Sequence, residues 1–241
     1  MINTKKRKFI FKIEQKWFYN EINGIDIFKF VKYIQFQKET KPRCFVKNVT
    51  YTLQSDLTVD EATIMQSYST TVRNEIRRSI KDKNIFTEIS PLQFLDFYNP
   101  FALLKKLKVY TPKEFDEYGS DLFTTGAFIE NKLVAAHSYL LDKQKGIVRL
   151  LLSCSSQLYT ENISKSFVAR ANKGLHYTDM LMFKAQGFIL YDWGGVSNKI
   201  DPTLEGIRKF KEGFGGELVE CISYSSYFYS LLFKLASKIK V

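Results

Sequence analysis

The spacing of apolar residues changes near residue 58. Before that point, short runs rich in β-branched and aromatic side chains predict strands at 9–13, 30–36 and 49–53. After it, apolar residues recur every four positions, which is typical of one face of a helix. The recurring positions are Ile64, Tyr68, Val72, Ile76 and Ile80. We therefore predict a β-rich segment over 1–57 and then a helix over 59–83, in which Ser69-Thr70-Thr71 allows a break.

Helix-start signals follow at three places. Thr58-x-x-Glu61 has the spacing of a capping box, in which each side chain bonds the other residue's backbone N–H. A capping residue, an N1 proline and an acid or amide recur in Ser90-Pro91-x-Gln93 and in Thr111-Pro112-x-Glu114. The last two signals predict helices over 91–106 and 112–119.

The rest of the middle region alternates between strand and helix patterns. Apolar runs on both sides of Asn131-Lys132 predict a hairpin of 122–130 with 133–141. The run at 147–154 is almost wholly apolar, which is typical of a central strand. Further helices are predicted at 167–186, which Gly187 ends, and at 203–213, and further strands at 188–192 and 217–222.

This order of elements predicts an α/β fold with a mixed sheet and helices on both faces. Ligands of such sheets bind at the carboxyl ends of strands, beside helix N-termini whose free N–H groups can receive anions. We therefore expect the functional site where the strand 147–154 runs into the segment 155–172.

Charge is unevenly distributed along the chain. The 241 residues include 36 basic and 25 acidic ones, a net charge of +11. Residues 1–58 carry +7 and residues 222–241 carry +3, whereas residues 59–221 carry only +1. Lys outnumbers Arg by 28 to 8, as AT-rich codon usage can produce, whereas a phosphate-reading surface favours Arg. The charge therefore indicates that the protein docks on an anionic partner, and it says little about the chemistry of the site. The 37 aromatic residues exclude a disordered chain.

The three cysteines, Cys44, Cys154 and Cys221, are widely spaced and odd in number. They form neither a disulfide framework nor a metal motif, so we expect a reducing cytoplasm. The basic cluster at 5–8 precedes an apolar run that is too short for a signal peptide, and no run reaches the ~20 apolar residues of a spanning helix.

Four stretches resemble the FemABX-related branch of the GNAT acyltransferases. The stretches are 71–78 (TVRNEIRR), 171–177 (ANKGLHY), 191–196 (YDWGGV) and 206–216 (GIRKFKEGFGG). The resemblance implies a GNAT-like domain over 58–222 with a mixed, mostly antiparallel central sheet. It leaves 1–57 as a basic, β-rich accessory segment and 223–241 as a basic amphipathic C-terminal helix.

The resemblance also implies an activity. Members of the branch transfer an activated acyl group to an amine, and the acceptor amine is itself the nucleophile. We expect acyl-CoA or aminoacyl-tRNA as co-substrate, with no tightly bound cofactor and no metal. The acceptor would be a nucleotide- or lipid-linked saccharide or a peptidoglycan peptide. The segment 170–175 misses the spacing of the pyrophosphate loop of acetyl-CoA-dependent members, so the donor stays open.

Three residues are catalytic candidates, Lys211 and Asp192 by this resemblance and His137 as one of only two histidines. Lys211 would stabilise the oxyanion, or it is a solvated lysine on a helix face. Asp192, at the end of an apolar strand and before two glycines, would orient or deprotonate the amine, or it caps the turn. His137 would act as a base, or it is a hydrogen-bonded residue of the core.

Other matched positions are candidates for binding. Substrate-binding candidates are Arg73, Asn74, Arg77, Phe210 and Trp193, and donor-side candidates are Arg170, Asn172 and His176. The alternative for the arginines is an exposed basic helix edge, and the alternative for His176 is packing. The apolar stripe of 224–239, with lysines nearby, would lie on a membrane surface or pack on its own domain. The rival to an enzyme is a non-catalytic module that binds RNA or a membrane.

Overall fold

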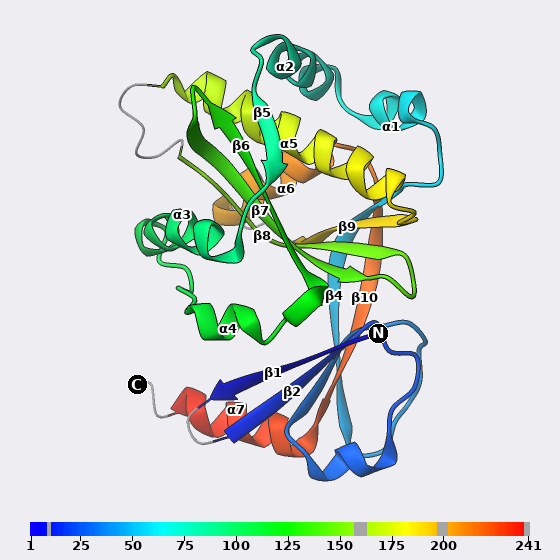
Figure 1. Cartoon of the computed structure of the whole chain (residues 1–241). Helices are drawn as coiled ribbons and strands as arrows, with labels where there is room; N and C mark the ends of the chain where they lie inside the picture. The colour runs from blue at the N-terminus through cyan, green and yellow to red at the C-terminus, as the bar shows by residue number, and fades with distance from the viewer. Residues whose placement is uncertain (9–10, 157–162, 197–201, 239–241) are drawn as a thin grey trace. The chain divides into compact units, whose positions relative to one another are not determined.

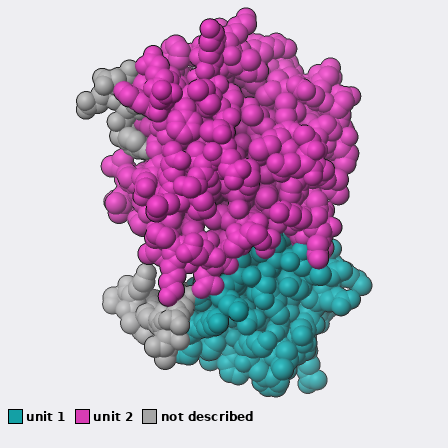
Figure 2. Space-filling model, in the orientation of Figure 1, with its two compact units in different colours: residues 1–52, 219–241 teal, residues 53–218 magenta. Residues whose placement is uncertain are grey.

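The computed structural model describes residues 1–8, 11–156, 163–196 and 202–238. The chain forms two compact units, which Figure 2 colours separately: unit 1 is residues 1–52 with 219–241, and unit 2 is residues 53–218. The sequence predicted boundaries after 57 and 222 and treated the two terminal segments as separate. In the structure both terminal segments belong to unit 1.

The sheet of unit 2 follows the order β4-β9-β8-β7-β6-β5, which begins with the end of β4 (Figure 1). The strands are β4 (Phe45–Asp56), β5 (Ile85–Glu88), β6 (Leu122–Ile129), β7 (Lys132–Asp142), β8 (Ile147–Ser155) and β9 (Leu190–Val196). β5 to β8 pair antiparallel, and β8 pairs with β9 in parallel. The predicted hairpin is β6–β7, and the apolar run forms β8 between two neighbours, as predicted.

Helices cover both faces of this sheet. They are α1 (Glu61–Ser67), α2 (Thr70–Lys81), α3 (Pro91–Leu104), α4 (Pro112–Asp116), α5 (Lys165–Ala185) and α6 (Pro202–Glu212). Successive residues of a strand point to opposite faces. Ala135 of β7 packs with Leu175 of α5, and the next residue, Ala136, packs with Phe94 of α3. The predicted mixed, mostly antiparallel sheet between two layers of helices is confirmed.

The break in the predicted helix at 59–83 is present. Ser69 caps α2, because its side chain accepts a hydrogen bond from the backbone N–H of Val72 at 3.3 Å. The capping box at Thr58 was wrong: Asp60 caps α1, and the hydroxyl of Thr58 bonds Asp56 instead. Asp60 lies one residue before the helix and its short carboxylate reaches the N–H of Thr63, so it displaces Thr58.

Unit 1 holds the remaining elements. They are β1 (Ile2–Lys8), β2 (Phe11–Trp17), the 3-10 helix η1 (Gly24–Phe28), β3 (Val31–Phe36), β10 (Glu217–Ser226) and α7 (Tyr227–Lys238). The strand order is β1-β2-β3-β10-β4, with β2 and β3 parallel. One cluster of its buried residues consists of Val31, Tyr33, Phe36, Phe45 and Tyr224. Tyr224, expected in the C-terminal stripe, lies in β10.

Two strands were not predicted. β1 contains the basic cluster at 5–8, and it forms because it pairs with β2 while Ile2 and Thr4 turn inward. β5 has almost no apolar alternation, and it is held as an edge strand by β6. Residues 9–10 of the predicted strand 9–13, part of the loop 155–166, and residues 239–241 lie outside the described residues. Within the described parts, no helix has the length and hydropathy that crossing a bilayer requires.

Candidate functional site

The candidate site lies where two parallel strands diverge. β8 and β9 pair over three positions, from Ile147↔Leu190 to Arg149↔Asp192. Beyond these positions β8 continues along β7, where its register shifts between Leu150 and Leu152 as in a β-bulge. Parallel strands that stop pairing leave room at their carboxyl ends, which is the usual place for a ligand in such a sheet.

Asp192 is fully buried, and its carboxylate is surrounded by donors. Oδ1 accepts a hydrogen bond at 2.7 Å from the guanidinium of Arg149 and another at 2.7 Å from the backbone N–H of Gly194. Gln54 donates to Oδ2 at 3.3 Å. The bond to Gly194 makes an Asx turn at Asp192–Gly194, inside β9. Asp192 thus connects the side chain of Arg149 on β8 to the backbone of Gly194 on β9.

Lys211 lies directly over that turn. Its Nζ donates a hydrogen bond to the carbonyl oxygen of Gly195 at 2.9 Å. Gly194 has φ +75°, and a Cβ there would stand 3.0 Å from the carbonyl oxygen of Leu150 and 3.7 Å from Lys211 Nζ. Glycine is therefore favoured by the left-handed backbone and by the close approach of the Leu150 carbonyl oxygen.

The surroundings of Lys211 lower its pKa to about 8, because burial disfavours the charged form and Arg149 adds repulsion. Asp192 opposes this shift. α6 presents Lys211 at its C-terminal turn, where the helix dipole favours a cation. The site thus places an ammonium that is readily deprotonated beside the end of the central strands.

Aromatic side chains line the α6 side of the site. Phe210 is partly buried, with its ring centroid 5.3 Å from Phe214 and 5.6 Å from His176. Trp193 is fully buried, and its indole N–H donates to Ser55 Oγ at 2.9 Å. The ring of Trp193 packs on Phe214, so Trp193 is part of the core. Phe210 directly precedes Lys211 in the sequence.

The two histidines meet, although 38 residues of sequence separate them. Their rings stack with centroids 3.8 Å apart, and both side chains are fully buried. His176 Nδ1 lies 3.2 Å from the hydroxyl of Tyr191, and its Nε2 has no hydrogen-bond partner among the described residues. Burial, with His137, Lys211 and Lys173 nearby, holds the pKa of His176 well below its ordinary value.

A buried carboxylate, Asp179 of α5, organises the polar groups around this pair. Its Oδ2 accepts hydrogen bonds from Thr125 Oγ1 at 2.9 Å, from Tyr139 OH at 2.6 Å and from His137 Nδ1 at 2.9 Å. Tyr139 OH also lies 3.1 Å from Tyr191 OH. Burial raises the pKa of both tyrosines well above the usual value, so both hydroxyls stay protonated.

The remaining candidates are held by other contacts. Arg73 donates to the carbonyl oxygens of Gln66 at 3.0 Å and Tyr68 at 2.9 Å, which closes the turn between α1 and α2. Asn74 and Arg77 are exposed on α2. On α5, Arg170 pairs with Asp82 at 3.0 Å, and Asn172 Oδ1 lies 3.0 Å from His137 Nε2.

The structure therefore brings together Lys211, Asp192, Trp193, Phe210 and His176. His137 stacks on His176, and Asn172 contacts His137. Sequence reasoning missed Arg149, Gln54 and Asp179. Arg149 is the lone charge in an apolar strand, and Asp179 is an acid near the apolar face of a helix. Because charged side chains are rarely buried unless they are paired, both positions could have been predicted to have a buried partner. Among the described residues, no cluster of His, Cys, Asp and Glu could hold a metal ion.

Comparison with solved structures identifies the fold. FemX superposes with a TM-score of 0.64 at 10% identity, over 97% of this chain and 85% of FemX. The C-terminal domain of a putative lysylphosphatidylglycerol synthetase from Agrobacterium fabrum gives 0.54 at 13% identity, over 88% and 72%. L-PGS from Bacillus licheniformis gives 0.54 at 13% identity, over 83% and 68%.

Searches with the sequence match no protein-family model and no curated protein. The likeness therefore resides in the backbone and shows the fold. It agrees with the resemblance that the motifs indicated, and with the layered mixed sheet described above. The chain has the same fold as FemX.

Proposed function

We propose that this protein is an N-acyltransferase that transfers an acetyl or aminoacyl group to an amino group of a bacterial cell-envelope precursor. The acceptor is an amino sugar of a surface polysaccharide or a peptidoglycan peptide. One observation carries the proposal: the ammonium of Lys211 is held 2.9 Å from the carbonyl oxygen of Gly195, where β8 and β9 diverge. The fold shared with FemX and the two synthetase domains supports this reaction class.

In the proposed reaction the acceptor amine attacks the carbonyl carbon of the acyl donor. A C–N bond forms, the carbonyl oxygen becomes an oxyanion, and the amine loses a proton. The oxyanion then re-forms the carbonyl as the bond to the leaving group breaks. The proton lost by the amine is taken up by that group, which departs as the thiol of CoA or a ribose hydroxyl of tRNA. Lys211 stabilises the oxyanion, an effect of about 3 kcal/mol for a single well-placed donor. Asp192 and Arg149 hold the turn over which this ammonium lies.

The donor is acyl-CoA or aminoacyl-tRNA. The donor-side candidates on α5 are already engaged, because Arg170 is paired with Asp82 and Asn172 lies against His137. A donor contact by Arg170 requires that ion pair to open. Substrate binding by Asn74 and Arg77 requires no such change, because both are exposed. The roles of all four residues remain part of the proposal.

The test is a transfer assay with purified protein. Acetyl-CoA and aminoacyl-tRNA are each offered with amino-sugar nucleotides and lipid-linked acceptors, and products are followed by mass spectrometry. We expect transfer from one donor, and a loss of about 100-fold in kcat/KM in Lys211→Ala. The matched control is Lys209→Ala, on the same helix but exposed and paired with Glu205 at 2.7 Å, which should retain full activity.

Two results would overturn the proposal. Full activity in Lys211→Ala would show that Lys211 does not stabilise the oxyanion, which is the observation on which the proposal depends. No transfer from either donor would instead favour the non-catalytic binding module, for which the expected behaviour is binding that falls steeply with salt.

A further inference from the structure

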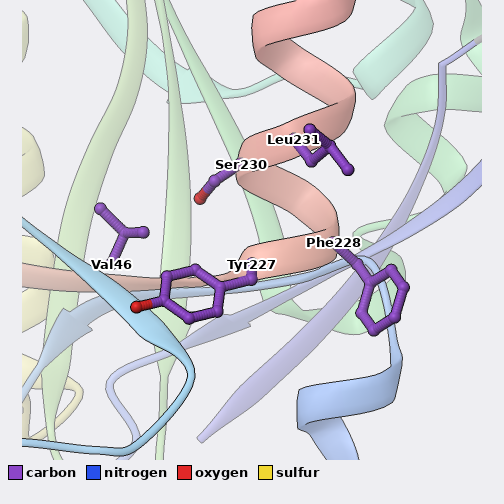
Figure 3. Close-up of a pocket in the computed structure, with 5 residues that line it drawn as sticks. All are labelled: Val46, Tyr227, Phe228, Ser230 and Leu231. Atoms are coloured by element: carbon purple, nitrogen blue, oxygen red, sulfur yellow. The ribbon is translucent and has the colours of Figure 1, made fainter.

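Unit 1 leaves a group of large apolar side chains exposed. Tyr227 and Leu231 of α7 are each 57% exposed, and Phe228 is 47% exposed. With Val46 of β4 and Ser230 they line a groove of about 330 Å³. Figure 3 shows these side chains projecting from the first turns of α7 and from the segment that carries Val46. A stripe that packed on its own domain would bury them, so the groove is available to a partner.

The 3-10 helix η1 extends this apolar surface. Phe28 is 73% exposed and Ile25 is 59% exposed. η1 contacts α7, and Phe30, which follows η1, meets the ring of Phe228 with centroids 6.2 Å apart. We call these exposed residues of η1, α7 and β4 the apolar face of unit 1. They are Ile25, Phe28, Val46, Tyr227, Phe228 and Leu231.

Buried polar contacts hold both helices of this face in place. Under η1, the fully buried Asp26 pairs with Lys16 and accepts a hydrogen bond from Tyr33 OH at 2.5 Å. Under α7, Ser226 Oγ donates to the carbonyl oxygen of Lys29 at 2.6 Å and accepts from the N–H of Tyr229 at 3.2 Å. The exposure of Phe28 and Phe228 is therefore fixed by the fold.

The charge of the protein is concentrated in the same unit. Unit 1 has 15 basic and 5 acidic residues, a net charge of +10, whereas unit 2 has 21 and 20, a net charge of +1. The backbone places two basic residues near the first turn of α7. Lys29 accepts a hydrogen bond from Ser226 through its carbonyl oxygen, and its ammonium pairs with Asp26 at 3.1 Å. Arg43, which is exposed, precedes Cys44, whose carbonyl oxygen accepts from Tyr227 N–H. From 227 to 241 the sequence has three lysines and no acid.

We propose that the apolar face of unit 1 docks on an anionic lipid bilayer. Exposed aromatic and aliphatic side chains on a unit of net charge +10 complement the boundary between anionic headgroups and acyl chains. Nucleic acid would use the charge but would leave the aliphatic residues Val46 and Leu231 in water. The proposal stands apart from the transfer reaction, since it concerns unit 1 and needs neither donor nor acceptor.

Co-sedimentation of the full chain with vesicles tests it. The vesicles are phosphatidylcholine alone, or with 30% phosphatidylglycerol, in 0.1 M NaCl. We expect binding to the anionic vesicles at least ~10-fold tighter than to the neutral ones, because each lysine near an anionic surface adds to the affinity. The double variant Phe228→Asp/Leu231→Asp should reduce anionic binding ~10-fold or more.

Leu103→Asp is the matched control, because Leu103 is an equally apolar residue that is 68% exposed on α3 of unit 2. It should bind as the unaltered chain does. Thermal unfolding of each variant confirms that it folds, and Phe28→Asp serves as a second test if the double variant does not. Equal binding to neutral vesicles, or unchanged anionic binding in the double variant, would overturn the proposal. So would binding to tRNA without binding to anionic vesicles.

Discussion

Lys211 illustrates at the scale of a residue how burial prepares a side chain for chemistry. Its pKa of about 8 leaves roughly nine-tenths of the side chain protonated at pH 7 and roughly one-tenth at pH 9. The sign follows from the cause, since burial destabilises the ammonium and so favours loss of the proton at lower pH. Lys209, two residues away and fully solvated, has its pKa raised by Glu205 instead.

The pH dependence of Lys211→Arg separates two roles of this side chain. If the ammonium stabilises the oxyanion, kcat of the unaltered protein should fall about tenfold between pH 7 and pH 9 as Lys211 deprotonates. Lys211→Arg stays charged, so its alkaline decline should disappear although its maximum is lower. Steady-state kinetics from pH 6 to 10 with a saturating acceptor measure this. A rate that rises through pH 8 and loses that rise in Lys211→Arg would instead indicate a neutral amine acting as base.

The candidate site was predictable residue by residue only where a motif marked it. Lys211 and Asp192 were found through the two glycine-rich motifs, and the structure places them on either side of one turn. The stacking of His137 on His176 was not predictable, because it depends on how β7 and α5 pack. Arg149 and Asp179 were missed because their hydrogen-bond partners, Asp192 and His137, are far away in sequence.

At the scale of elements, local signals predicted most of unit 2. Capping residues and N1 prolines placed α3 and α4, and Gly187 with φ +86° ended α5 as expected. Elements held by pairing rather than by their own pattern were missed, as with β1 and β5. The chain gives no local signal for such strands, since their stability comes from neighbours brought together only in the fold.

The contact between α2 and α5 is a second feature that depends on the fold. Gly174 lies inside α5, and a Cβ there would stand 2.4 Å from Ser79 Oγ and 2.7 Å from the ring of Phe86. Gly206 also lies inside a helix, α6, but a Cβ there would meet nothing within 4 Å. The two glycines therefore have the same cost in helix propensity and opposite tolerance for a side chain.

Alanine substitutions at these glycines should change stability in opposite directions. Gly206→Ala should raise the free energy of unfolding by about 0.5–1 kcal/mol, because alanine restricts the unfolded chain and favours helix. Gly174→Ala should lower it by about 1–3 kcal/mol, because the overpacked methyl group forces α2 away from α5. Urea unfolding followed by circular dichroism measures both. Stabilisation by Gly174→Ala would show that the two helices separate without cost.

At the scale of the whole molecule, charge and chemistry belong to different units. The sequence alone divided the net charge by segment, and the structure joins the two charged segments into unit 1. Unit 2 holds Lys211 and the buried polar network, and it is almost neutral. An electrostatic attraction to a charged surface then acts through unit 1, while the pKa of Lys211 in the candidate site depends on local desolvation rather than on the total charge.

Matched charge reversals test this division. Lys38→Glu/Lys41→Glu/Arg43→Glu removes six units of positive charge from unit 1, and Lys105→Glu/Lys113→Glu/Lys132→Glu removes the same amount from unit 2; all six side chains are exposed. Because electrostatic attraction is strongest within a Debye length, about 10 Å at 0.1 M salt, only charges near the docking face should matter. The unit 1 triple should weaken binding to anionic vesicles about tenfold or more, at about 1 kcal/mol per basic residue, and the unit 2 triple should leave it nearly unchanged. Equal losses in both triples would mean that total charge, and not its placement, governs association.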